Sequence, residues 1–150
     1  MPPVETETMT QPETTEETEL TPLQILTREF EDCPAEGTLE VWKQQFGTIH
    51  AFTPDAETVV IFRPLRRLEH KNITRDMRQL SETQAAQMNP AMVEEHLHEK
   101  VVTACVLHPT VTVEMFNTSA AGLIPTLFNL VMENSKFIAP ERALANCFKL

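Results

Sequence analysis

The scarcity of glycine constrains the fold of this chain more than any other feature of its sequence. There are only 3 glycines among 150 residues, and the aromatic residues are 8 Phe and 1 Trp. Sandwiches and barrels of short strands need frequent tight turns, and many such turns require glycine because it adopts positive φ without steric strain. So few glycines disfavour a β-sandwich and favour helices. They also leave no glycine-rich loop of the kind that binds phosphate groups.

Acidic charge is concentrated at the start of the chain. Residues 1–19 contain six Glu and neither Lys nor Arg, whereas residues 20–150 contain 16 acidic and 12 basic residues, a net charge of −4. The first segment is rich in Thr, Glu and Pro, so it buries too little apolar surface to offset its conformational entropy. We expect a disordered acidic tail over residues 1–19 and a single domain over residues 20–150. The tail either keeps the protein soluble or becomes ordered on a basic partner.

The cysteines and the amino-terminal sequence predict a reducing, cytosolic environment. The three cysteines, Cys33, Cys105 and Cys147, cannot all form disulfides with one another. The first residues lack the basic and apolar regions of a signal peptide, and no apolar run approaches the roughly 18 residues that cross a membrane. The acidic balance also argues against nucleic acid as a partner, because neutralising phosphates requires a net basic surface.

Hydrophobic periodicity predicts an α+β fold: a mostly helical single domain with a small antiparallel β-hairpin. The hairpin is expected from residues 48–52 and 58–62, which are rich in β-branched and aromatic residues and flank a Pro-Asp turn. Residues 81–88 are expected to be a polar connection, and residues 110–116 fit either a strand or a helix. Helices are expected from 22 to about 33, from 38 to 46, from 65 to about 80, from 90 to about 107, from 120 to 134, and from 139 onwards.

Several helix ends carry capping signals. Thr21 followed by proline is typical of an N-cap with proline at the first helical position, and Asn89 followed by proline repeats that pattern. Gly47 is suited to a left-handed C-terminal cap. Pro125 either kinks the helix that begins near residue 120 or moves its start to about residue 124.

Residues with catalytic or metal-binding potential do not combine into a known type of site. Glu95 and His98 form one Glu-x-x-His pair, but di-iron bundles use two such pairs with two further glutamates. Cys105 and His108 have the residue types of a nucleophile and its base, but a cysteine in an apolar stretch is more simply a small core residue. Three serines lack the flanking turns of a nucleophile elbow: Ser81, Ser119 and Ser135. We therefore expect no enzyme, no metal and no cofactor.

One segment of the domain is strongly basic, and we predict it as the partner-binding site. It holds half of all the Lys and Arg residues in the chain: Arg63, Arg66, Arg67, Lys71, Arg75 and Arg78. Four of the six follow helical spacing, which predicts a stripe apart from Leu65, Leu68 and Ile73. This stripe is either an ordinary solvated face or a docking surface for an acidic partner, for which the chain's own glutamate-rich tail also qualifies. Nucleic acid suits it less, since interleaved aromatic residues are lacking.

Four segments within about residues 38–138 carry a recognisable pattern. A Trp and a Gly precede the expected hairpin, its second strand ends in Arg, and the next helix opens with basic residues and a Glu-His pair. Val-Leu-His-Pro and Ala-Gly-Leu-Ile-Pro follow, and the segments are residues 42–49, 60–70, 101–109 and 121–137. In this order they resemble the small cytosolic tail-assembly proteins of tailed bacteriophages, of the assembly-chaperone type. His70 and His108 depart from the family pattern, which has an aromatic residue, usually Tyr, at both positions.

The resemblance implies a non-catalytic assembly factor that binds other phage tail proteins in the host cytoplasm. Its expected partners are proteins, with neither nucleic acid nor membrane, and its expected contacts are the basic residues together with Phe137 and Phe148 if these are exposed. The alternative is a minor structural tail or baseplate component that stays in the virion. A third possibility, an inhibitor whose acidic tail mimics nucleic acid, is disfavoured because the tail is short and rich in Thr.

Overall fold

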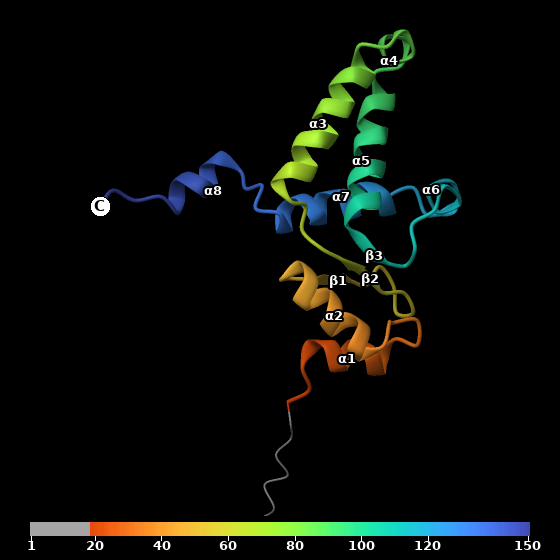
Figure 1. Cartoon of the computed structure of the whole chain (residues 1–150), viewed down its shortest axis with the longest axis vertical. Helices are drawn as coiled ribbons and strands as arrows, with labels where there is room; N and C mark the ends of the chain where they lie inside the picture. The colour runs from red at the N-terminus through yellow and green to blue at the C-terminus, as the bar shows by residue number, and fades with distance from the viewer. Residues whose placement is uncertain (1–18) are drawn as a thin grey trace, which may run out of the picture.

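The computed structural model describes residues 19–150, so all of the expected disordered tail except Glu19 lies outside the described residues. The elements in order are α1 (Pro22–Glu29), α2 (Glu36–Phe46), β1 (His50–Phe52), β2 (Val60–Phe62), α3 (Arg67–Ser81), α4 (Gln84–Met88), α5 (Ala91–Cys105), β3 (Val106–His108), α6 (Val113–Thr118), α7 (Leu123–Asn134) and α8 (Pro140–Ala145). Figure 1 shows α1 and α2 on one side of a small sheet and α3, α5 and α7 on the other. This arrangement confirms the predicted mostly helical α+β fold.

The sheet is antiparallel with the strand order β1-β2-β3. The expected hairpin forms from β1 and β2, with Ala51 opposite Ile61. Strand β3 was not expected, because the helical pattern that ends in α5 extends in sequence to about residue 107. The structure ends α5 at Cys105 instead, and the next residues pair with β2, placing Val106 opposite Phe62. The prediction of a helix through residue 107 was therefore wrong, since pairing with a distant strand overrides the local pattern.

Strand β2 is buried on both faces, so it contributes to the core of each helical layer. Val60 and Phe62 belong to the larger cluster, which is completed by residues of α3, α5 and α7. Ile61 and the preceding Val59 belong to a smaller cluster with Leu39 of α2. All five side chains are at most 2% exposed. The alternation of side chains along one strand thus connects the two layers.

The α1–α2 layer follows its local signals. Thr21 caps α1 as expected, by accepting a hydrogen bond from the amide of Gln24. The side chain of Gln24 accepts one from the Thr21 amide in return, which completes a capping box that was not expected. Helix α1 ends at Glu29, earlier than the expected end at about residue 33. Helix α2 ends at Phe46, and Gly47 follows with φ +81°, a conformation that favours glycine.

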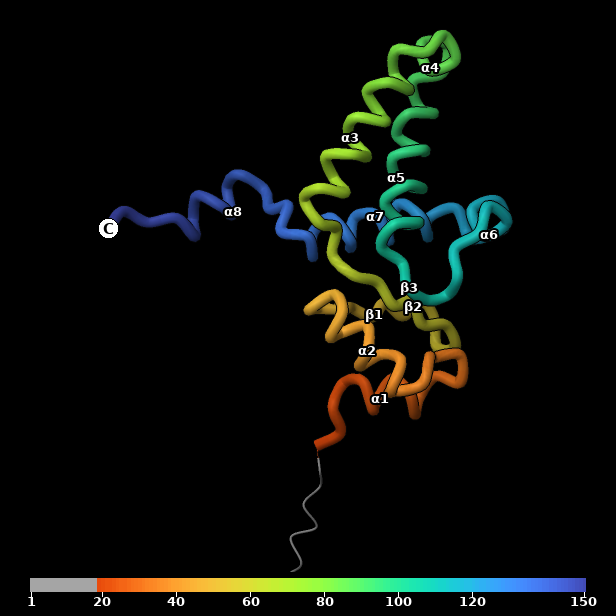
Figure 2. Tube along the Cα trace, viewed as in Figure 1, coloured from red at the N-terminus to blue at the C-terminus, as the bar shows by residue number. Residues whose placement is uncertain are grey.

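Helices α3 and α5 run side by side in opposite directions, and the Cα trace in Figure 2 shows α4 connecting their far ends. The expectation of a polar connection over residues 81–88 was wrong for its second half. Thr83 caps α4 by accepting a hydrogen bond from the amide of Ala86, which is buried. Helix α5 has Pro90 rather than Asn89 at its N-cap position.

Helix α7 crosses the ends of α3 and α5 nearest the sheet (Figure 1). It begins at Leu123, so Pro125 lies in the first turn, where a missing amide donor has little effect. Of the two expected starts of this helix, residue 124 is therefore closer to the observed start than residue 120. The ambiguous residues 110–116 contain the start of helix α6, capped by a hydrogen bond from the Met115 amide to Thr112. Helix α8 and residues 146–150 extend away from the other elements (Figure 1).

Candidate protein-binding surface

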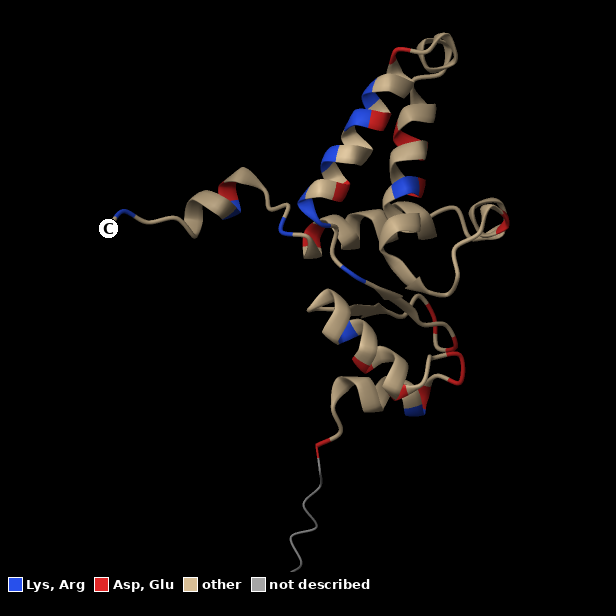
Figure 3. Ribbon diagram, in the orientation of Figure 1, with Lys and Arg blue, Asp and Glu red and all other residues tan. Residues whose placement is uncertain are grey.

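Helix α3 carries a continuous basic stripe on its outer side. Its inner side is fixed by Ile73 and Met77, which are buried in the larger cluster together with the preceding Leu65. The predicted basic residues other than Arg63 are exposed: Arg66, Arg67, Lys71, Arg75 and Arg78. Figure 3 shows the basic positions of α3 along one side of the helix, facing away from α5. We call Arg67, Lys71, Arg75 and Arg78 the α3 basic surface.

The α3 basic surface does not stabilise its own helix. Basic residues four positions apart repel each other by about 0.2–0.5 kcal/mol per pair. Arg67 also lies in the first turn, where the helix dipole disfavours a cation. Within residues 19–150, Arg67, Lys71 and Arg78 form no ion pair, and Arg75 pairs only with its exposed neighbour Asp76 at 3.4 Å. Within the described residues, most of the positive charge of this surface is therefore not compensated by ion pairs.

Arg63 lies inside the protein, apart from the other predicted contact residues. Its side chain forms a two-pronged pair with Glu69, with Nη1–Oε1 at 2.7 Å and Nη2–Oε2 at 2.6 Å. Nη2 also donates to the carbonyl oxygen of Ala104 in α5 at 2.8 Å. The hydrogen bond from Arg63 lowers the pKa of Glu69, although burial of the carboxylate opposes this. Arg63 is therefore removed from the predicted partner-binding site, because Glu69 already neutralises its charge within the fold.

Arg66 has a mixed role between the two layers. Its guanidinium lies 5.6 Å from the ring centroid of Phe46, and the guanidinium of Arg63 lies 5.0 Å from the same centroid. Arg66 also donates to the carbonyl oxygen of Gln45 at 3.4 Å, and its amide donates to Glu69. These contacts join the end of α2 to the start of α3. Arg66 is exposed but partly used by the fold, so we exclude it from the α3 basic surface.

Exposed apolar side chains flank the α3 basic surface. Leu68 was expected on the buried side of α3, but it is 68% exposed because its position on the helix is next to Arg75. On the other flank, the ring of His70 lies 4.8 Å from that of Phe137, which is 47% exposed. Phe148 is also exposed, which was the condition for counting it among the expected partner contacts. The basic stripe thus has apolar neighbours, a combination found at protein interfaces.

The structure gives each residue of the Glu-x-x-His pair an ordinary environment. Glu95 is exposed, whereas His98 packs its ring 4.2 Å from that of Phe128 in α7. Its Nε2 lies 3.9 Å from Glu94, the neighbour of the expected partner. Among the described residues, no group of three or more His, Cys, Asp or Glu side chains is arranged to hold a metal ion.

Cys105 and His108 occupy different environments. Cys105 is fully buried, and burial raises the pKa of its thiol to about 12, so it remains a neutral core residue. His108 lies at the end of β3, with Nε2 3.5 Å from Oδ2 of Asp32 in the α1–α2 connection. The Ser135 hydroxyl donates to the carbonyl oxygen of Val131 and accepts from the amide of Leu65. Ser135 therefore connects the end of α7 to the segment that precedes α3.

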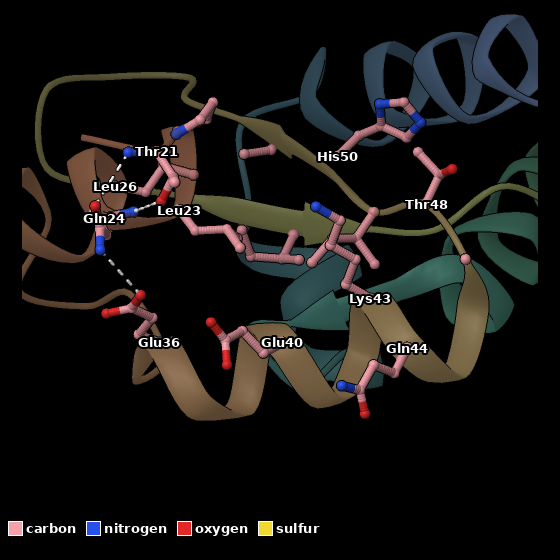
Figure 4. Close-up of a pocket in the computed structure, with 15 residues that line it drawn as sticks. Thr21, Leu23, Gln24, Leu26, Glu36, Glu40, Lys43, Gln44, Thr48 and His50 are labelled. Carbon is pink, nitrogen blue, oxygen red and sulfur yellow. Dashed lines mark hydrogen bonds between the residues drawn. The ribbon is translucent and has the colours of Figure 1, made fainter. Parts of the chain in front are cut away.

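A second feature, not expected from the sequence, is a groove of about 1010 Å³ between the α1–α2 layer and strand β1. Figure 4 shows Leu23 and Leu26 reaching into it from α1, with Glu36, Glu40 and Lys43 along α2. Residues of α1, α2, β1 and β2 all contribute to its walls. No local sequence signal marks it, because the groove exists only once these elements have packed together.

No helix in residues 19–150 combines the length and apolarity that crossing a bilayer requires. No family model matches the chain, and neither a characterised protein nor a solved structure shows significant similarity to it.

Proposed function

We propose that this protein is a non-catalytic assembly factor that binds another protein through the α3 basic surface. The single observation that supports this proposal most is the exposed run of Arg67, Lys71, Arg75 and Arg78, of which only Arg75 forms an ion pair, with Asp76, within residues 19–150. A surface of one sign attracts and orients a partner of the opposite sign. We therefore infer that the partner presents an acidic patch beside apolar groups that meet Leu68 and Phe137.

The resemblance described above directs the proposal to phage tail proteins as the partners. Such a factor covers a charged or apolar surface of a tail subunit until that subunit assembles, and no covalent chemistry is needed. The same surface also suits a minor tail or baseplate component that remains in the virion. The two roles differ in where the protein is found, since an assembly factor leaves before the particle is complete.

Charge reversal on α3 tests the binding surface. We expect Lys71→Glu/Arg75→Glu to reduce capture of tail proteins from infected-cell lysate at least tenfold, and to make the remaining binding less sensitive to salt, because the attraction is electrostatic. Both side chains are exposed, so circular dichroism should show an unchanged fold.

The matched control reverses the same number of charges on the other side of the sheet. Arg28→Glu/Lys43→Glu changes two exposed residues of α1 and α2, and capture should stay within about twofold of wild type. Equal capture by both double variants would refute the α3 basic surface. Mass spectrometry of purified particles beside lysate then separates the roles: fixed copy number in particles supports the structural component, and absence supports the assembly factor.

A further inference from the structure

Strand β1 has a free edge that opens into the groove. The strand order places β1 at the border of the sheet, with β2 on one side only. In the described part of the chain, His50–Phe52 make no backbone hydrogen bond to a third strand. Thr48 and His50 border the groove in Figure 4, so a strand added there would meet both the unpaired backbone groups of β1 and the open groove. Such an edge is a site for pairing with an extended peptide.

The groove offers an apolar floor with acidic groups along α2. Leu23, Leu26 and Ile49 are each only partly buried, and they pack against the buried Ile61. Glu36 and Glu40 line the α2 side, and the residues that form its walls include one Lys (Lys43), one His (His50) and no Arg. Glu36 accepts one hydrogen bond, from Gln24 at 3.4 Å, while Glu40 makes none in the described residues. An occupant should therefore be extended, apolar on one face and net basic.

The chain itself contains a segment with these properties. Residues 138–150, which we call the arm, carry Arg142 and Lys149 against Glu141, a net charge of +1 in a chain of net charge −10. Arg142 pairs with Glu133 of α7 at 3.5 Å, so Lys149 is the basic residue of the arm that forms no ion pair within residues 19–150. Residues 147–150 have no helix or strand assignment, and Phe148 and Leu150 are 79% and 108% exposed. Side chains two positions apart lie on one face of an extended chain, so these two residues form an apolar face.

We propose that the groove binds the arm of a second copy of this chain, with residues 147–150 added as a strand beside β1. Phe148 and Leu150 then cover Leu23 and Leu26, and Lys149 lies close to the acidic side of the groove. The protein's own arm leaves the fold in another direction (Figure 1), so the contact joins two copies. Because the arm and the groove are different surfaces, each copy can bind one neighbour through its arm and another through its groove.

The first test measures the mass of the full chain in solution by sedimentation equilibrium. Wild type should associate above the 17.0 kDa monomer as concentration rises. Phe148→Asp, which changes an exposed side chain, should weaken association at least tenfold, because a charge replaces a large apolar group at the contact. Leu23→Asp should do the same from the groove side. A wild-type protein that stays monomeric, or a Phe148→Asp protein that associates normally, would overturn the proposal.

Mixing the two variants distinguishes arm-in-groove pairing from other self-association. A Phe148→Asp chain retains an intact groove and a Leu23→Asp chain retains an intact arm, so an equimolar mixture should form a dimer that neither forms alone. A symmetrical contact between two arms or two grooves would give no such recovery, and a mixture that stays monomeric would contradict the proposal.

A charge exchange covers the case in which Leu23→Asp loses its fold. Glu40→Lys and Lys149→Glu both alter exposed residues, and each should weaken association about two- to fivefold, as expected for a solvent-accessible ion pair. The combined variant should recover wild-type association, because the charges are exchanged rather than removed. Additive weakening in the combined variant would show that the arm does not lie along the acidic side of the groove.

Discussion

The guanidinium of Arg63 joins three parts of the chain. It follows strand β2, pairs with Glu69 of α3, and donates to the carbonyl oxygen of Ala104 in α5. Arg63 is only 9% exposed, so its charge depends on these partners rather than on water. Glu69 in turn accepts from the Arg66 amide at the start of α3. One carboxylate therefore both neutralises a buried cation and caps a helix.

We predict that Glu69→Gln lowers the free energy of unfolding by about 1–3 kcal/mol at neutral pH, since Arg63 loses its counter-ion in a largely buried site. The contribution depends on pH with a defined sign. Because Arg63 lowers the pKa of folded Glu69, the stabilisation is complete above the unfolded pKa of about 4.3. It is lost as the pH falls through the lower pKa of the folded state.

Urea denaturation at a series of pH values from neutral to about 3 measures this dependence. The difference in stability between wild type and Glu69→Gln should shrink in acid. Glu133→Gln is the matched control, because Glu133 forms only an exposed pair with Arg142 at 3.5 Å. A stability difference for Glu69→Gln that stays constant with pH would contradict this account of the pair.

The sequence was informative about basic residues in helical register but not about Arg63. Helical spacing from Arg67 to Arg78 is a local property, and the structure places those side chains on one exposed side as expected. The burial of Arg63 depends on Ala104, which is 41 residues away along the chain. A contact between residues so far apart in sequence leaves no periodic signal. From the sequence alone, Arg63 therefore could not be distinguished from the exposed arginines of α3.

At the scale of elements, the sequence predicted correctly those helix ends and strands that depend on interactions between residues close together in the chain. The Thr21 cap and the Gly47 stop depend on residues within a few positions of one another, and the hairpin pairs residues that are at most 12 positions apart. Strand β3 depends instead on pairing with β2, more than 40 residues earlier, and its own residues continue the apolar pattern of α5. The groove depends on four elements at once. These non-local features were the ones missed.

Replacing Gly37 of α2 and Gly47 at its end by alanine should change the stability of the protein in opposite directions. Gly47 has φ +81°, so Gly47→Ala should destabilise the protein by about 1–2 kcal/mol through backbone strain alone, because an added Cβ meets no atom within 4 Å. Gly37 lies in the first turn of α2 with equally open surroundings. Gly37→Ala should stabilise by about 0.4–1 kcal/mol through the lower entropy of the unfolded chain. Thermal unfolding of both variants checks the signs, and destabilisation by both would contradict the assignment.

At the scale of the whole molecule, the central question is whether the two helical layers fold together. Each layer has its own apolar cluster, and the α1–α2 cluster is the smaller. Both clusters contain residues from β2, whose side chains are buried on either side of the sheet. Arg63 and Arg66 add a second connection by lying over Phe46. Because each cluster includes side chains of β2, we expect the two layers to unfold together, as the predicted single domain over residues 20–150 requires.

The position of the one tryptophan allows a direct test of that coupling. Trp42 packs in the α1–α2 cluster, whereas Leu127 of α7 is fully buried in the other cluster. Leu127→Ala should destabilise the protein by about 2–5 kcal/mol by leaving a cavity. If the layers unfold as one unit, urea titrations followed by Trp42 fluorescence and by far-ultraviolet circular dichroism should shift to the same lower midpoint.

Leu144→Ala is the control for this comparison, because Leu144 is 76% exposed in α8 and its loss should change stability by less than about 0.5 kcal/mol. A Trp42 transition that keeps its wild-type midpoint, while the circular dichroism transition moves, would show two independently folding layers. The α3 basic surface and the β1 groove would then belong to separate units. Coincident transitions instead mean that a ligand bound to either surface stabilises the whole chain, because each site exists only in the one folded state.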